Sequence, residues 1–255
     1  MTTSFWLLVA GLGIGTMASM IGVGGGVFMV PLLALTGLVA TTQEAVGTSI
    51  AGVIFTSLSS SVAYWRRGTI RVGLGLAVMP GALIGAWLGA YLSHHISSGW
   101  LAVAFGLFLL YPAGVMILGK QPKELFPAKS EGGGHSVVGT WVGLIAGLTS
   151  GLLGLGGGTV MVPALMLTLG LDIREAVATS LFVMVPSAAL ATSQHALAGN
   201  THWELAIPLI LGIVVGAQLG PALGGRLPKK RLRQLFSLVL LYAAINMVLK
   251  GLGLR

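Results

Sequence analysis

The sequence predicts an all-α polytopic membrane protein with two inverted-topology repeats, each made of a Gly-broken helical pair and three further transmembrane helices. Three observations support this fold class: the composition, the order of apolar segments and an internal duplication. The 255 residues are 55% hydrophobic and 8% charged, whereas a soluble domain carries about 25% charged residues. A chain this apolar cannot cover its surface with polar groups, so we expect it to lie in a lipid bilayer.

Apolar segments follow one another along the chain, and lipid requires each of them to be helical because it offers no partners to backbone groups. A polar linker at 120–136 separates a first repeat, 1–119, from a second, 137–255. The first segment has no basic residue before it and an internal counterpart, so we interpret it as part of the fold and not as a signal peptide. The segments are 5–21, 26–39, 45–64, 72–93, 100–118, 138–153, 158–170, 176–197, 204–224 and 234–250.

The two halves are copies of one another. "GVGGGVFMVP" at 22–31 matches "GLGGGTVMVP" at 154–163 at seven of ten positions, and "EAVGTS" at 44–49 matches "EAVATS" at 175–180 at five of six. The offset stays at 131 to 132 residues, which indicates a duplication. Both halves also carry glycines at every fourth residue, which predicts closely packed membrane helices. These glycines are Gly81, Gly85, Gly89, Gly212, Gly216 and Gly220.

Loop charges give each half an orientation. In the first half the loop at 64–71 has three Arg and the loop at 93–99 has no Lys or Arg, whereas in the second half 196–204 has none and 224–234 has five. Equivalent loops therefore face opposite sides, as in inverted repeats. With the basic loops in the cytoplasm, twelve of the fourteen Lys and Arg lie inside and both termini lie outside. This placement explains the net charge of +8 without a nucleic-acid partner.

The reversed orientation requires an odd number of crossings in each half. Five full helices satisfy it, and so do three full helices preceded by a hairpin that enters and leaves on one side. Both arrangements are open for residues 5–39 and 138–170. In either case the glycine motif interrupts the helical pair at the start of each half. We expect Gly24–Gly26 and Gly156–Gly158 to approach each other near the membrane midplane.

Three interpretations of the glycine motif compete. Small residues allow close helix packing, and a glycine-rich run followed by Glu44 resembles the spacing of a dinucleotide fingerprint. The fingerprint is excluded because the motif has no βαβ context. The third interpretation is an anion site, in which free N–H groups and the positive end of a helix face the ligand. We favour it, because paired interruptions in corresponding halves are typical of a transporter's binding site.

The candidate binding groups are neutral. No Lys or Arg lies in the middle of an apolar segment, where an Arg would cost roughly 2.5 to 3.5 kcal/mol. An anion would therefore be bound by glycine N–H groups and hydroxyls, although each hydroxyl has the alternative of bonding to a carbonyl of its own helix. The candidate substrate-binding residues are Gly24, Gly25, Gly26, Thr48, Ser49, Gly156, Gly157, Gly158, Thr159, Thr179, Ser180 and Gln194.

Three ionisable residues stand out in the apolar segments or at their starts. We interpret Glu44 and Glu175 as helix-capping residues, with proton coupling as the alternative. We interpret His195 as an interfacial residue, with a ligand or proton carrier as alternatives. The chain has no Cys, no metal-ligand spacing and no nucleophile with a base, so we expect no catalytic residues, no metal and no cofactor. The sequence leaves the oligomeric state open.

Taken together, these motifs resemble the TauE/SafE family of sulfite and organosulfonate exporters. The resemblance is carried by the doubled apolar "GxGGGxxxVP", by "EAVxTS" and by "HALAGN" at 195–200, and it covers about Ala10 to Leu249. It implies a bacterial or archaeal inner-membrane protein that exports a small sulfur-containing anion such as sulfite, sulfoacetate or a related organosulfonate. A transporter or channel for another small anion, such as a carboxylate, is the alternative, and outside transport a structural membrane subunit.

Overall fold

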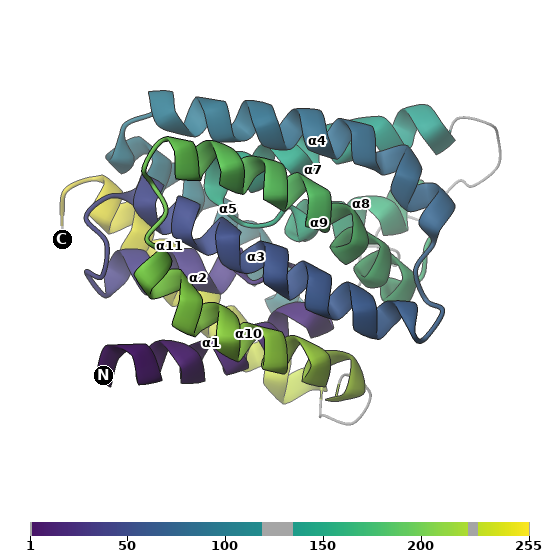
Figure 1. The fold of residues 1–255 in the computed structure, drawn as a ribbon, viewed down its shortest axis with the longest axis horizontal. Helices are drawn as coiled ribbons and strands as arrows, with labels where there is room; N and C mark the ends of the chain where they lie inside the picture. The colour runs from purple at the N-terminus through teal and green to yellow at the C-terminus, as the bar shows by residue number, and fades with distance from the viewer. Residues whose placement is uncertain (1, 119–134, 224–228, 255) are drawn as a thin grey trace.

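The computed structural model describes residues 2–118, 135–223 and 229–254, and within these ranges all regular secondary structure is α-helical. The helices lie side by side in one bundle, and α1 begins at the end of the bundle where α11 ends, on the left of Figure 1. The predicted linker at 120–136 falls outside the described residues except for its last two, which belong to α7. The helices are α1 Thr2–Ile21, α2 Gly26–Leu35, α3 Thr42–Trp65, α4 Val72–His95, α5 Ser98–Leu118, α7 His135–Leu153, α8 Gly158–Thr168, α9 Ile173–Leu197, α10 Trp203–Leu223 and α11 Lys229–Gly251.

The chain is a multi-pass membrane protein. Five helices, α1, α3, α4, α9 and α10, are long and apolar enough to cross a bilayer. All six Trp side chains of the chain are exposed at the surface of the bundle, between 43% and 72%, where a membrane would cover them. The buried centre is formed by α3 and α9, of which 78% and 67% of the apolar stretch is buried, against 33% for α1. These two helices pack against each other.

A glycine turn separates α1 from α2, and another separates α7 from α8. Gly25 and Gly157 directly precede α2 and α8 in the left-handed conformation, with φ of 91° and 76°, which glycine adopts without strain. The second arms have only 10 and 11 residues, or about 15 Å of helix. They are therefore too short to cross a bilayer of about 30 Å alone.

Several helix ends differ from the predicted segments. The prediction of helix to residue 39 and to residue 170 is wrong, because α2 ends at Leu35 and α8 at Thr168. Gly37 and Gly170, with φ of 72° and 67°, turn the chain there. At the other ends, α1, α3, α7, α9 and α11 begin three to five residues before the predicted segments, because polar residues extend these helices beyond their apolar part.

The capping role predicted for Glu44 and Glu175 is confirmed. The Glu44 carboxylate accepts a hydrogen bond of 2.9 Å from the N–H of Ala40, just before α3. Glu175 and Asp172 form a capping box at the start of α9, in which each side chain accepts from the backbone N–H of the other. Both carboxylates thus lie in the first turn of a helix, where the helix dipole favours negative charge.

The glycines at every fourth residue pack helices together, as predicted. A Cβ on Gly85 of α4 would overlap the Leu144 carbonyl of α7, and one on Gly216 of α10 would overlap the Leu12 carbonyl of α1. The other four predicted glycines meet backbone or side-chain atoms of the same partner helices in the same way. The partners contribute glycines of their own, which the sequence did not single out as packing residues. These are Gly11, Gly15, Gly143, Gly147 and Gly151.

Candidate functional site

The two glycine turns lie against each other at the centre of the bundle. A Cβ on Gly26 would overlap the carbonyl oxygen of Gly154, and a Cβ on Gly158 would overlap the carbonyl oxygen of Gly22. A Cβ on Gly24 would lie 3.6 Å from Cα of Gly156. The predicted approach of the two breaks is therefore confirmed, and it explains why both helix starts need glycine.

Both helix starts leave backbone donors free. Hydrogen bonding resumes at Phe28 and Val160, whose N–H groups donate to the carbonyls of Gly25 and Gly157. Before these positions, the N–H groups of residues 24–27 and 156–159 donate to no acceptor within the described part of the chain. All eight residues are buried, where an unpaired N–H is costly. Two positive helix ends with free donors thus meet, which is the geometry of an anion cradle.

Two apolar side chains fill the space between the facing glycines. Cγ1 of Val53, on α3, lies 3.0 Å from a Cβ built on Gly24 and 2.8 Å from one built on Gly156. Cε of Met184, on α9, lies 2.6 Å from the Cβ on Gly156. Neither residue was predicted from the sequence. Their position one helical turn after Ser49 and Ser180, on the same helix face, could have identified them.

The paired serines fasten each break to the other half. The Ser49 hydroxyl donates to the carbonyl of Gly154 at 3.2 Å, and the Ser180 hydroxyl donates to the carbonyl of Gly22 at 3.3 Å. Each hydroxyl also reaches, at 2.9 Å, the carbonyl three residues earlier in its own helix. The alternative of bonding within the helix is thus realised, and in this conformation both hydroxyl protons face protein carbonyls.

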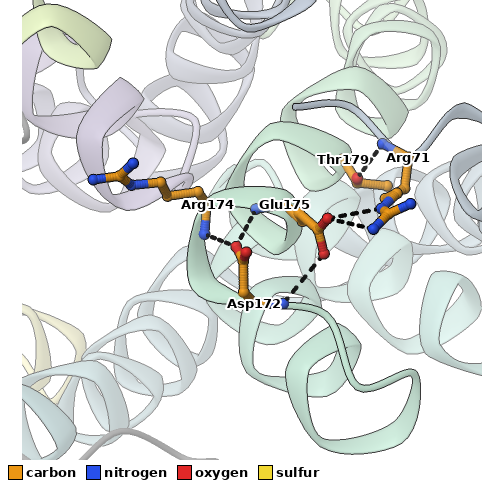
Figure 2. A network of polar contacts seen from close by, with 5 residues as sticks. All are labelled: Arg71, Asp172, Arg174, Glu175 and Thr179. Carbon is orange, nitrogen blue, oxygen red and sulfur yellow. Dashed lines mark hydrogen bonds and ion pairs between the residues drawn. The ribbon is translucent and has the colours of Figure 1, made fainter. Parts of the chain in front are cut away.

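The paired threonines bind loop backbone. Thr179 Oγ1 accepts from the N–H of Arg71 at 3.1 Å, and Thr48 Oγ1 accepts from the N–H of His202 at 3.0 Å. Figure 2 shows Thr179, Arg71 and Glu175 converging, while the Arg174 side chain points away. Each threonine therefore ties the start of one central helix to a loop of the other half.

Beside each threonine, a carboxylate of the same helix contacts a side chain of the loop. The Arg71 guanidinium lies 2.6 Å from a carboxylate oxygen of Glu175, and His202 Nε2 lies 3.1 Å from one of Glu44. A depression of about 500 Å³ opens over the Arg71–Glu175 pair, between residues 70–74 and 169–171. Like the threonine contacts, the two pairs occupy equivalent positions in the two halves.

The remaining candidates differ in their relation to the breaks. Thr159 stands in the first turn of α8, and its buried hydroxyl has no hydrogen-bond partner among the described residues. Gln194 is ten residues beyond Met184 on α9, about 15 Å along the helix, so the structure does not bring it to the breaks. The interpretation of His195 as interfacial is wrong. Its side chain is fully buried, because α4 and α7 pack over it.

Similarity to known proteins extends over nearly the whole chain. Residues 7–247 match the profile of the family described as "Sulfite exporter TauE/SafE". The probable membrane transporter protein YunE of Bacillus subtilis is 32% identical, over 96% of this chain and 97% of its own length. YdhB, another probable membrane transporter protein of that organism, is 29% identical, over 85% of this chain and 88% of its own length. The probable membrane transporter protein MJ0441 of Methanocaldococcus jannaschii is 25% identical, over 95% of this chain and 94% of its own length. No solved structure matches the chain.

Proposed function

We propose that this chain, which belongs to the sulfite exporter TauE/SafE family of membrane transporters, exports a small sulfur-containing anion such as sulfite, sulfoacetate or a related organosulfonate. A membrane transporter acts on a small molecule in a lipid environment. The observation that carries the proposal is the contact between the two glycine breaks, where unpaired N–H groups from both halves meet. Buried donors of this kind favour an anionic ligand with several acceptor oxygens.

The proposed site binds the anion through neutral donors. The N–H groups of Gly24–Gly26 and Gly156–Gly158 surround it, and the free hydroxyl of Thr159 adds a further donor. Each hydrogen bond to a charged group contributes about 1.5 to 3 kcal/mol, and each helix end about 0.3 to 2 kcal/mol. A net total of about 4 to 8 kcal/mol from such contacts, after the cost of association, corresponds to millimolar to micromolar affinity, which is weak enough for release. Ser49 and Ser180 hold the breaks in place.

Met184 and Val53 occupy the proposed site when it is empty. Because they fill the space between Gly24 and Gly156, an anion enters only when one of them moves. Met184 is the mobile member, since an unbranched side chain with three rotatable bonds adapts at low cost, whereas branched Val53 is stiff. This conformation is thus a closed one, with the terminal methyl group of Met184 in the place of the ligand.

We further propose that the two halves are inverted repeats. The contact of Gly26 with Gly154 recurs as the contact of Gly158 with Gly22, and the pairing of α1 with α10 recurs as that of α7 with α4. A two-fold axis in the membrane plane would generate this exchange of halves. The protein would lie in a bacterial or archaeal inner membrane with its basic loops in the cytoplasm. The membrane potential, negative inside, then favours anion exit by about 2.3 kcal/mol per charge per 100 mV.

Ligand binding and counterflow test the proposal. Purified protein is screened by thermal shift against sulfite, sulfate, sulfoacetate, taurine, thiosulfate and acetate, and sulfite counterflow is measured in proteoliposomes. We expect the sulfur-containing anions to stabilise the protein and counterflow to saturate. A preference for acetate would support the carboxylate alternative, and non-saturating flux would support a channel.

A matched pair of glycine variants locates the site. Gly156→Ala and Gly37→Ala both place a side chain at positive φ, 84° and 72°, at a similar backbone cost of about 1–2 kcal/mol. Only Gly156 faces the breaks, because a Cβ on Gly37 meets nothing within 4 Å. We expect Gly156→Ala to lose sulfite binding and Gly37→Ala to keep it. Sulfite binding that survives in folded Gly156→Ala would place the anion elsewhere.

A further inference from the structure

A buried pair of histidines lies apart from the glycine breaks. The rings of His94, on α4, and His195, on α9, have centroids 5.0 Å apart and planes inclined by 65°. His195 is fully buried, and its Nε2 lies 3.1 Å from the carbonyl oxygen of Gly151 on α7. His94 is half-buried, and its Nδ1 lies 3.1 Å from the amide nitrogen of Asn200. Each ring thus has one nitrogen engaged.

The partners fix which nitrogen carries the proton. A carbonyl only accepts, so Nε2 of His195 carries hydrogen and its Nδ1 presents a lone pair. The Asn200 amide nitrogen only donates, so Nδ1 of His94 presents a lone pair and its Nε2 carries hydrogen. Nδ1 of His195 and Nε2 of His94 have no hydrogen-bond partner among the described residues. The pair therefore leaves a buried acceptor, Nδ1 of His195, close to a donor, the Nε2–H group of His94. The acceptor nitrogen can take up one more proton.

The first half shows that the structural contact does not require histidine. Tyr64 is equivalent to His195 at an offset of 131 residues, and its hydroxyl donates to the carbonyl of Ser19 at 3.0 Å. Ser19 and Gly151 both lie three residues before the first glycine of a break, Gly22 and Gly154. A tyrosine thus makes in one half the contact that a histidine makes in the other, and of the two side chains only the histidine can take up a proton on the acid side of neutral pH.

Among the described residues, no fixed opposite charge is paired with the two histidines. From α3, Glu44 stands on the same side of the bundle, but its carboxylate pairs with His202. His95 is exposed and packs against Tyr91 of its own helix. The described side chains of α1, α7 and α8, which also pack near α9, include no ionisable group. His94 is therefore the ionisable group that faces His195.

We infer that His94 and His195 form a site for one proton, and that this proton strengthens anion binding at the glycine breaks; the second statement rests on the proposed function. A proton from water reaches the pair past half-buried His94 and adds to the lone pair on Nδ1 of His195. The N–H bond forms as an O–H bond of hydronium breaks, water is left behind, and the ring becomes an imidazolium. Its Nε2–H then makes a charged, stronger hydrogen bond to Gly151, at the turn of α7 that leads into the break.

The added charge and the anion assist each other. A positive charge on His195 would lie eleven residues, about 16 Å, along α9 from Met184, and in surroundings of low dielectric constant it attracts an anion held by neutral donors over this distance. Because linkage is reciprocal, a bound anion also raises the proton affinity of the pair. A coupling of ordinary size changes affinity at least about fivefold, so sulfite should bind about fivefold tighter to the protonated protein.

The variant His195→Tyr tests the inference, since it installs the residue that the first half uses. Sulfite affinity of the full chain in detergent is measured at about pH 5 and about pH 8 for both proteins. The titration of sulfite itself is the same in both measurements and cancels. We expect the gain in affinity at low pH to be about fivefold larger in the wild-type chain. The same pH dependence in both proteins would overturn the coupling.

The proton site is also tested without any anion. Histidine ring resonances of the full chain are followed by NMR against pH, and the His195 signal is assigned by its loss in His195→Tyr, or in His195→Gln if the tyrosine variant does not fold. We expect this signal to titrate and His94→Gln to shift its titration. A His195 signal that does not titrate, or is unaffected by His94→Gln, would refute the proton site. A titrating pair without sulfite binding would refute the proposed function alone.

Discussion

Replacing Gly26 by alanine is the most direct test of the contact between the breaks. Gly26 is the first residue of α2 and is absent from the positions with positive φ, so alanine suits its backbone. The added Cβ would overlap the carbonyl oxygen of Gly154 and lie 2.8 Å from Cα of Leu155. Both are backbone atoms, which cannot rotate away as a side chain can. The two breaks must therefore separate.

The size of the effect follows from three contributions. Overpacking a closely packed site costs about 1–3 kcal/mol. Separating the breaks also loses the hydrogen bond from Ser49 to Gly154, worth about 0.5–1.5 kcal/mol. Alanine returns at most about 1 kcal/mol through its higher helix propensity. We therefore expect Gly26→Ala to lower the free energy of unfolding by about 0.5–4.5 kcal/mol and to reduce sulfite counterflow.

The assay combines thermal unfolding in detergent with counterflow in proteoliposomes. Gly13→Ala is the control, because Gly13 lies within α1 and a Cβ there meets nothing within 4 Å. We expect this control to be at least as stable as the wild-type chain and fully active. If Gly26→Ala matches the control in both measurements, the two breaks do not touch as described.

Two further predictions follow from the hydrogen bonds and the loop charges. Ser180→Ala removes the hydroxyl that donates to the Gly22 carbonyl, and should lower the unfolding free energy by about 1 kcal/mol in thermal unfolding; an unchanged stability would show that the bond contributes nothing. Single cysteines at Arg66 and Lys230 should react with an impermeant thiol reagent from the cytoplasmic side, and one at Leu254 from the outside. Labelling of the first two from opposite sides would refute the inverted topology.

The site was only partly predictable from the sequence. The duplication identified both breaks, and their approach followed from it. Val53 and Met184 were missed because the sequence of an apolar helix does not show which of its apolar side chains face lipid and which face another part of the protein. The serines were identified, but the carbonyls they bind lie 105 and 158 residues away, beyond any local pattern. His195 was misplaced, because a histidine near a helix end can lie at an interface or beneath a neighbouring helix.

The sequence by itself determined the features that depend on composition and repetition. Few charges on a long apolar chain require a membrane and helices, clustered glycines require a break, and glycines at every fourth residue require a close neighbour. Only the tertiary structure decided which neighbour that is. It placed α7 against α4, joined the N-terminal ends of α2 and α8, and put Tyr64 and His195 over equivalent carbonyls. These choices depend on contacts between residues far apart in the chain, whose energies are set by packing and leave no periodicity in the sequence.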